Sequence, residues 1–136
     1  MYATLGRELN ASLLARHGIT LSDYEVLLRL AGASGRRLRR VDLAAQVLLS
    51  PSGITRLLDG LERAGLVCRA ECSADRRVVY AELTDAGEER LREAGETHAD
   101  DVTRILGGRL DEAELRMLDG LLARLPGGEE NGSCRV

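Results

Sequence analysis

The middle of the 136-residue chain reads Ser50-Pro51-Ser52-Gly53-Ile54-Thr55-Arg56-Leu57-Leu58-Asp59-Gly60-Leu61-Glu62-Arg63-Ala64-Gly65. Ser50 suits the position before a helix, because its hydroxyl can accept a hydrogen bond from a first-turn amide. Pro51 suits the first helical position, where no N–H is needed. Apolar residues then recur at i, i+3, i+4 and i+7 from Ile54 to Leu61. With the final glycine as a stop, the pattern predicts one amphipathic helix.

The polar face of this predicted helix carries Ser52, Thr55, Arg56 and Asp59. Short hydroxyls and a guanidinium near a helix N-terminus provide donors for phosphates and base edges with little bulk. The same face would also suit an ordinary surface helix, so this stretch alone leaves both interpretations open.

The segment before it, residues 38–49, predicts a short strand and then a helix with Leu43, Ala44 and Val47 inward. A turn at Leu48-Leu49 joins that helix to the next one, which gives a helix-turn-helix. Because Ala44 is small, the second helix can cross the first closely.

The segment after it predicts a β-hairpin. Residues 66–70 and 78–83 are β-prone runs, and the polar tip between them, residues 71–77, carries two arginines. Helix, turn, helix and basic hairpin together predict a winged helix-turn-helix, a mainly α fold with a small β-hairpin wing.

The motifs along residues 21–91 follow a specific order. They are Leu43-Ala44, Ser50-x-Ser52-x-Ile54-Thr55-Arg56-Leu57, Gly65-Leu66-Val67-x-Arg69, Asp75-Arg76-Arg77 and Leu83-Thr84-x-x-Gly87. This succession resembles the MarR family of bacterial transcriptional regulators. The family usually has glycine where this chain has Leu48, which predicts a wider turn. It often has a basic residue where this chain has Gly60, which predicts one phosphate contact fewer.

Charge is distributed unevenly along the chain. All 19 basic residues are arginines, and the formal net charge is −3. Residues 36–77 carry an excess of four positive charges, whereas residues 82–136 carry an excess of seven negative ones. The acidic average therefore does not argue against a nucleic-acid partner, since positive charge is concentrated around the predicted helix-turn-helix and wing.

Helical patterns flank this central unit. The first predicted helix covers residues 2–16. The second begins after Thr20 or Ser22 and has Tyr24, Leu27, Leu28 and Ala31 inward. A long helix capped by Thr84 follows the hairpin, and a last helix covers residues 111–125. On the long helix Leu91, Gly95, His98, Val102 and Ile105 form a heptad seam. We expect residues 126–136 to be disordered.

These flanking helices carry more apolar surface than a small core can cover. We expect residues 1–20 and 84–125 to form a helical dimerisation region and residues 21–83 to form the DNA-binding domain; the alternative is a bundle within one chain. A homodimer would place two reading helices about 34–36 Å apart on a palindromic site in double-stranded DNA, and the family resemblance implies the same dimer.

The expected major-groove contacts are Ser52, Gly53, Thr55 and Arg56, with Ser50 capping the helix and touching a phosphate. Phosphate contacts are expected from Arg39, Arg40 and Arg69. Each arginine has the alternative of being a solvated surface charge.

At the wing, Arg76 or Arg77 is expected to enter the minor groove, where a narrow A·T tract concentrates negative potential. The family resemblance implies that an aspartate steadies the wing arginine, which here suggests Asp75 and Arg76.

The three cysteines, Cys68, Cys72 and Cys134, favour a structural or incidental role. The alternative is a redox-responsive regulator acting through Cys72 or Cys68. Four residues of strand separate those two by about 13 Å, too far for a disulfide unless the hairpin bends. His17 and His98 have no ligand partners at metal-binding spacing, so we expect neither a metal nor another cofactor.

No nucleophile elbow or phosphate-binding glycine loop is present, so we do not expect an enzyme. The remaining rival is a winged helix used for protein contacts. The chain shows no signal peptide or membrane span, which predicts a cytoplasmic location without membrane association.

The resemblance implies a transcriptional regulator, most simply a repressor, released by a small phenolic or anionic effector. Arg16, His17 and Tyr24 are the residues that we would place near such a ligand.

Overall fold

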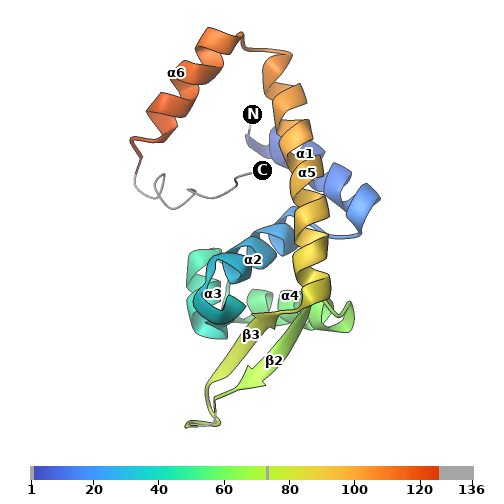
Figure 1. The fold of residues 1–136 in the computed structure, drawn as a ribbon, viewed down its shortest axis with the longest axis vertical. Coiled ribbons are helices and arrows are strands. Elements are labelled where there is room, and N and C mark those ends of the chain that lie inside the picture. The colour runs from blue at the N-terminus through green and yellow to red at the C-terminus, as the bar shows by residue number, and fades with distance from the viewer. Residues whose placement is uncertain (1, 73, 126–136) are drawn as a thin grey trace. The chain divides into compact units, whose positions relative to one another are not determined.

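The computed structural model describes residues 2–72 and 74–125 (Figure 1). The elements are α1 (Tyr2–His17), α2 (Leu21–Gly32), a 3-10 turn (Ser34–Arg36), β1 (Arg37–Arg39), α3 (Arg40–Gln46), α4 (Pro51–Arg63), β2 (Val67–Glu71), β3 (Val79–Leu83), α5 (Asp85–Gly107) and α6 (Glu112–Leu122). The chain forms two compact units, Met1–Ala99 and Asp100–Val136. The tail predicted to be disordered, residues 126–136, lies outside the described residues.

Helix starts follow the capping chemistry expected from the sequence. The Thr20 hydroxyl accepts a hydrogen bond from the amide of Asp23, whose carboxylate in turn accepts from the Thr20 amide, so α2 begins with a capping box. The Ser50 hydroxyl accepts from the amide of Gly53 at 3.1 Å, and Pro51 is the first residue of α4. None of the described helices is both long enough and apolar enough to span a membrane.

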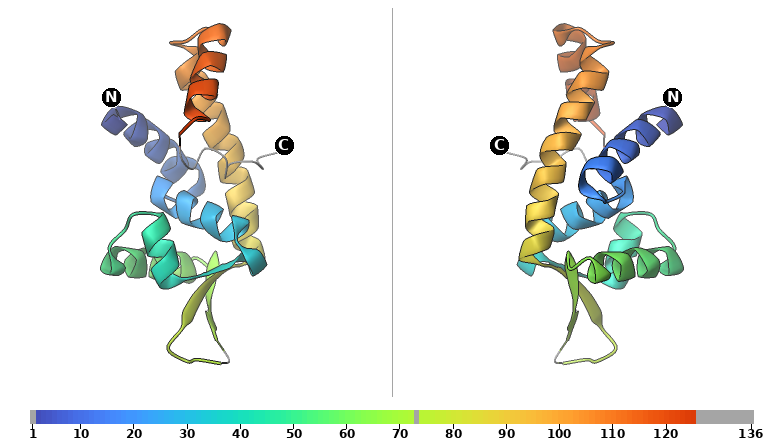
Figure 2. Two further views of the ribbon diagram at one scale, coloured as in Figure 1. Left: turned by 90° about the vertical axis from the view of Figure 1, so that its left-hand side faces the viewer. Right: turned by 90° about the vertical axis from the view of Figure 1, so that its right-hand side faces the viewer.

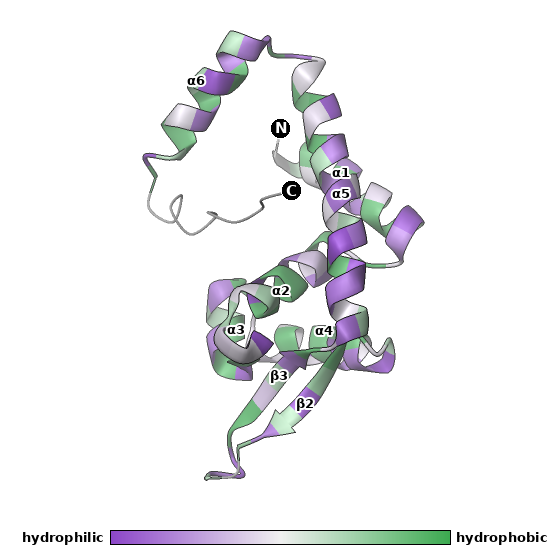
Figure 3. Cartoon of the chain, viewed as in Figure 1, coloured by the Kyte–Doolittle hydropathy of each residue, from purple (hydrophilic) through white to green (hydrophobic). Residues whose placement is uncertain are grey.

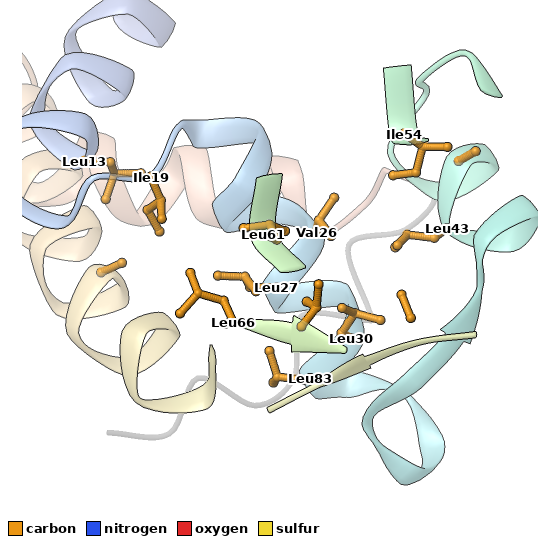
Figure 4. Packing of buried hydrophobic residues seen from close by; sticks show 14 residues of the cluster. Leu13, Ile19, Val26, Leu27, Leu30, Leu43, Ile54, Leu61, Leu66 and Leu83 are labelled. Atoms are coloured by element: carbon orange, nitrogen blue, oxygen red, sulfur yellow. The ribbon is translucent and has the colours of Figure 1, made fainter. Parts of the chain in front are cut away.

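Helix α2 lies at the centre of the first unit's core (Figure 4). The inward set predicted for it was only partly right. Leu27 is fully buried as predicted, but so are Val26 and Leu30, whereas Leu28 and Ala31 are half-buried. The reason is that α1 and strands β1 and β3 contact α2 on different sides, so its buried face is wider than one helical stripe.

The residues that share this core come from helices α1 to α5, from strands β2 and β3, and from the segments just before α2 and β2. They are Leu13, Ile19, Val26, Leu27, Leu30, Leu43, Ala44, Ile54, Leu61, Leu66, Val67, Ala81, Leu83 and Ala94. On α5, Ile105 of the predicted seam is buried and Leu91 and Gly95 are half-buried, whereas Ala94, which is not part of that seam, is fully buried.

The three strands form an antiparallel sheet in the order β1-β3-β2. Strands β2 and β3 form the predicted hairpin within one residue of the expected bounds, with Arg69 opposite Ala81. Figure 2 shows this hairpin projecting beyond α2, α3 and α4. The winged helix-turn-helix architecture is therefore confirmed.

The turn between α3 and α4 is tight, so the expected widening at Leu48 was wrong. Leu48 itself adopts the left-handed conformation, with φ of 54°, and the Leu49 amide donates to the Ala44 carbonyl at 3.1 Å. This is the helix-ending arrangement normally made by glycine. Leu48 is 90% exposed, so packing does not stabilise this conformation.

The start of α5 is held against the end of α4. The Thr84 hydroxyl donates to the Gly65 carbonyl at 2.7 Å and accepts from the Gly87 amide at 3.0 Å. A Cβ on Gly87 would lie 2.0 Å from the Leu66 carbonyl oxygen, so only glycine fits at this crossing. This contact accounts for the glycine that follows the Leu83-Thr84 motif.

Candidate nucleic-acid interface

The N-terminal turns of α4 present the residues predicted to read the major groove. Ser52 and Arg56 are exposed, and Gly53 and Thr55 are half-buried. A Cβ on Gly53 would lie 3.1 Å from the Ser50 hydroxyl oxygen, so the glycine leaves room for the cap. The Thr55 hydroxyl donates to the Pro51 carbonyl at 2.8 Å. Its oxygen is therefore oriented to accept from a donor on a partner, such as a base amine.

Arg56 carries the positive charge of this surface. Within residues 2–72 and 74–125, no carboxylate lies within ion-pair distance of its guanidinium. Its donors are thus available for a phosphate or a guanine edge.

The wing tip is shaped by Asp75. Its carboxylate accepts from the Arg77 amide at 2.9 Å, and its carbonyl accepts from the Val78 amide at 3.1 Å. Asp75 thus closes the turn through backbone groups, and among the hydrogen bonds of the described residues the Arg76 side chain donates none to the Asp75 carboxylate. Arg76 and Arg77 are both exposed, and neither pairs with a carboxylate of the described chain.

The three expected phosphate contacts have different surroundings. Arg39 donates to both carboxylate oxygens of Asp42, at 2.6 and 3.1 Å, and these hydrogen bonds raise the pKa of Arg39. Arg69 donates to Asp59 at 2.6 Å and to Glu62 at 2.9 Å. Arg40, half-buried at the start of α3, pairs with no carboxylate of the described residues. Of the three, Arg40 is the one not already engaged by a protein anion.

Two groups in this region were not anticipated from the sequence. The first is the pair of acids that bind Arg69, Asp59 and Glu62, whose spacing of three residues places them on one face of α4. The second is Arg37, whose guanidinium stacks over the Tyr80 ring at 5.1 Å from the ring centre. The pairing of β1 with β3 brings these two together, and the local sequence contains no signal for it.

The residues proposed for ligand contact separate into two groups. The Nε2 of His17 lies 2.7 Å from the Thr97 hydroxyl, and the Tyr24 ring lies 5.1 Å from the ring of His98. The structure thus brings His17 and Tyr24 against neighbouring residues of α5. Arg16 is exposed and has no such contact among the described hydrogen bonds and ion pairs.

The cysteines that the structure describes have free thiols. Cys68 is exposed on β2, and Cys72 is half-buried just after that strand ends. Cys134 lies outside the described residues. In the parts of the chain that the structure describes, no three His, Cys, Asp or Glu side chains are grouped so as to hold a metal ion.

Comparison with known proteins agrees with this geometry. A family model described as MarR family matches residues 17–78. The transcriptional repressor YetL of Bacillus subtilis is 32% identical over 114 residues, which cover 82% of this chain and 68% of YetL. The structure of AbsC, a MarR family transcriptional regulator of Streptomyces coelicolor, is 34% identical with a TM-score of 0.76, covering 89% of this chain and 81% of AbsC. The chain belongs to the MarR family.

Other members of the MarR family show the same likeness. A second Streptomyces coelicolor regulator, solved in complex with DNA, is 30% identical with a TM-score of 0.79, over 89% of this chain and 76% of that one. Apo MarR of Escherichia coli is 26% identical with a TM-score of 0.81, over 89% and 87%. Members of the MarR family are transcriptional regulators rather than enzymes, and this assigns the chain to transcription regulation through DNA.

Proposed function

We propose that this MarR family member is a homodimeric repressor that binds a palindromic operator in double-stranded DNA. The observation that carries the proposal is the exposed N-terminal end of α4, where Ser52, Thr55 and Arg56 lie beside a capped first turn. A helix N-terminus favours anions, and its polar side chains are short enough to approach base edges. The DNA-bound relative has the same fold.

In this proposal the wing supplies a second point of contact. Arg76 or Arg77 enters the minor groove next to the site read by α4. Phosphate contacts come from Arg40, from the Ser50 end of α4, and from Arg39 where a phosphate replaces Asp42 as its partner. Asp75 acts by shaping the turn that presents both wing arginines.

Dimerisation is supported by apolar side chains that the described residues leave uncovered. On α6 and just after it, Met117, Leu121, Leu122 and Leu125 are each more than half exposed, and Figure 3 shows apolar residues along α6. Burying such side chains is favourable, and a second copy of the chain is the partner that brings the same surface. We therefore assign residues 1–20 and 84–125 to dimerisation and residues 21–83 to DNA binding.

A small phenolic or anionic effector would act by preferring one spacing of the two reading helices over another. His17 and Tyr24, which lie against α5, together with Arg16, are the side chains proposed to sense it.

DNA binding by purified protein tests the proposal. A duplex selected from a random-sequence library by the wild-type protein serves as the specific site, and a scrambled duplex serves as competitor. Arg56→Ala and Arg76→Ala should each lower specific affinity about tenfold and reduce the steepness of its salt dependence. Arg29→Ala is the control, since Arg29 lies on α2, pairs with Glu25 of the same helix, and is neither in the proposed dimerisation region nor a proposed DNA contact. Failure of the library to yield any preferred sequence would refute the proposal.

A further inference from the structure

The side chain of Arg69 joins the wing to α4, the helix proposed to enter the major groove. From β2, its Nη2 donates to Asp59 Oδ1 at 2.6 Å and its Nε donates to Glu62 Oε2 at 2.9 Å. Both carboxylates belong to α4 and lie one helical turn apart. Two bonds from a planar guanidinium to two separate acids restrict rotation of the strand about the helix, whereas a single bond would act only as a pivot.

A small cavity marks the junction between helix and wing. It has a volume of about 20 Å³, roughly the size of one water molecule. Leu58 and Val67 line it together with Arg69. Asp59 and Glu62 also line this cavity, so the two ion pairs connect helix and strand directly beside it.

The charge of this cluster argues against phosphate binding. One arginine with two carboxylates carries a net charge of −1, and a phosphate approaching Arg69 would meet both acids at less than 3 Å from its nitrogens. Arg76, by contrast, has no carboxylate partner among the described residues.

We propose that Arg69 is a positioning residue for DNA recognition: it holds the wing at the angle at which α4 and the wing arginines reach adjacent grooves together. This inference rests on the proposed function, because it assumes that both elements contact DNA. It replaces the expectation that Arg69 contacts a phosphate.

Loss of these ion pairs should leave the domain folded. The Arg69 side chain is 56% exposed, and exposed pairs contribute little to global stability. The core residues beneath them, including Ile54, Leu61 and Val67, are buried. A change in DNA recognition can therefore be measured on folded protein.

The variants are Arg69→Met, which keeps the apolar stem, Asp59→Asn with Glu62→Gln, and the triple combination. The measured quantity is the ratio of affinity for the selected duplex to affinity for the scrambled one, across a salt series below the melting midpoint. Arg29→Met is the control: Arg29 also forms an ion pair, with Glu25 at 4.0 Å, but both residues lie on α2, outside the proposed dimerisation region, and Arg29 is not a proposed DNA contact.

We expect Arg69→Met to lower this ratio about fivefold, the effect of two modest ion pairs, with no change in salt slope. The double acid variant should lower it as well, although removal of negative charge alone would tighten DNA binding. The triple variant should lower the ratio no further than Arg69→Met does, because the acid substitutions and Arg69→Met break the same ion pairs. The control should leave the ratio unchanged.

Two results would overturn the inference. A salt slope lower by about one in Arg69→Met would indicate a lost phosphate contact. Tighter binding of both duplexes by the double acid variant, with an unchanged ratio, would show that the acids merely repel DNA. Wild-type protein that prefers no duplex would instead refute the proposed function, so the two failures are distinguishable.

Discussion

Leu48 and Gly65 occupy equivalent positions after the ends of α3 and α4. Leu48→Gly should raise the stability of the protein, and Gly65→Ala should lower it. Both residues have left-handed backbone, with φ of 54° and 74°. In both turns the next amide bonds to a carbonyl five residues back, from Leu49 to Ala44 and from Leu66 to Leu61. One turn uses the residue that tolerates this conformation, and the other does not.

The magnitude follows from two opposing terms. A non-glycine residue in the left-handed region costs about 1–2 kcal/mol, which Leu48→Gly would relieve. A glycine loses more backbone entropy on folding than leucine does, and this reduces the gain in stability by about 0.5–1 kcal/mol. Leu48 is 90% exposed, so almost no buried area is lost. We expect a net stabilisation of about 0.5–1 kcal/mol, or a rise of about 2–4 °C in the melting midpoint.

Thermal and urea unfolding at one fixed protein concentration would measure this. Gly65→Ala should lower the midpoint by a similar amount, because a Cβ there meets no atom within 4 Å and only the backbone term changes. Leu48→Ala is the control for the lost apolar side chain and should be close to neutral. A midpoint lowered by Leu48→Gly, or a gain matched by Leu48→Ala, would refute the conformational argument. DNA affinity should not change, since the turn keeps its shape.

Three further predictions concern α5. Gly87→Ala should destabilise the protein by about 3 kcal/mol in urea unfolding, because its Cβ would meet the rigid Leu66 carbonyl; a neutral effect would show that the helix can shift away. Thr84→Val should cost about 1–2 kcal/mol, since it removes both the cap and the donor to the end of α4; a loss no larger than that of an exposed threonine would contradict this role. The pKa of Glu89 lies below its usual value, chiefly because Arg92 donates hydrogen bonds to its carboxylate. The Glu89–Arg92 pair therefore contributes its full stabilisation at pH values above the usual glutamate pKa. That stabilisation is lost as the pH falls through the lowered pKa. In Arg92→Met the carboxyl titration seen by NMR should return toward the usual value; an unchanged titration would contradict the pairing.

Helix α4 could be predicted almost completely because its sequence signals are local. The cap at Ser50, the proline that follows and the apolar spacing all act within one turn or two. The hairpin was equally accessible, since its strands are neighbours in sequence and its tip is polar. Exposure of Arg56 and Arg76 followed from the same local patterns.

Other features depended on which elements meet. Helix α2 was assigned a single inward stripe, but contacts from several sides bury Val26 and Leu30 as well. The partners of Arg69 lie seven and ten residues earlier in the chain, and they come together only because the chain reverses at Gly65. A charge count along the sequence could not separate this arginine from one free to bind a phosphate.

Capping residues, turn glycines and hydrophobic spacing were therefore enough to define the order of the helices and strands and the winged helix-turn-helix, whereas the family was indicated by the resemblance of the motifs. Those features express backbone preferences of short segments, which distant contacts rarely reverse. The tertiary structure was needed to show which arginines are already neutralised, why Gly87 admits no side chain, and that Leu48 takes a conformation suited to glycine. Each of these depends on atoms brought close by folding, because hydrogen bonds and steric contacts act over a few ångströms of space, whatever the separation along the chain.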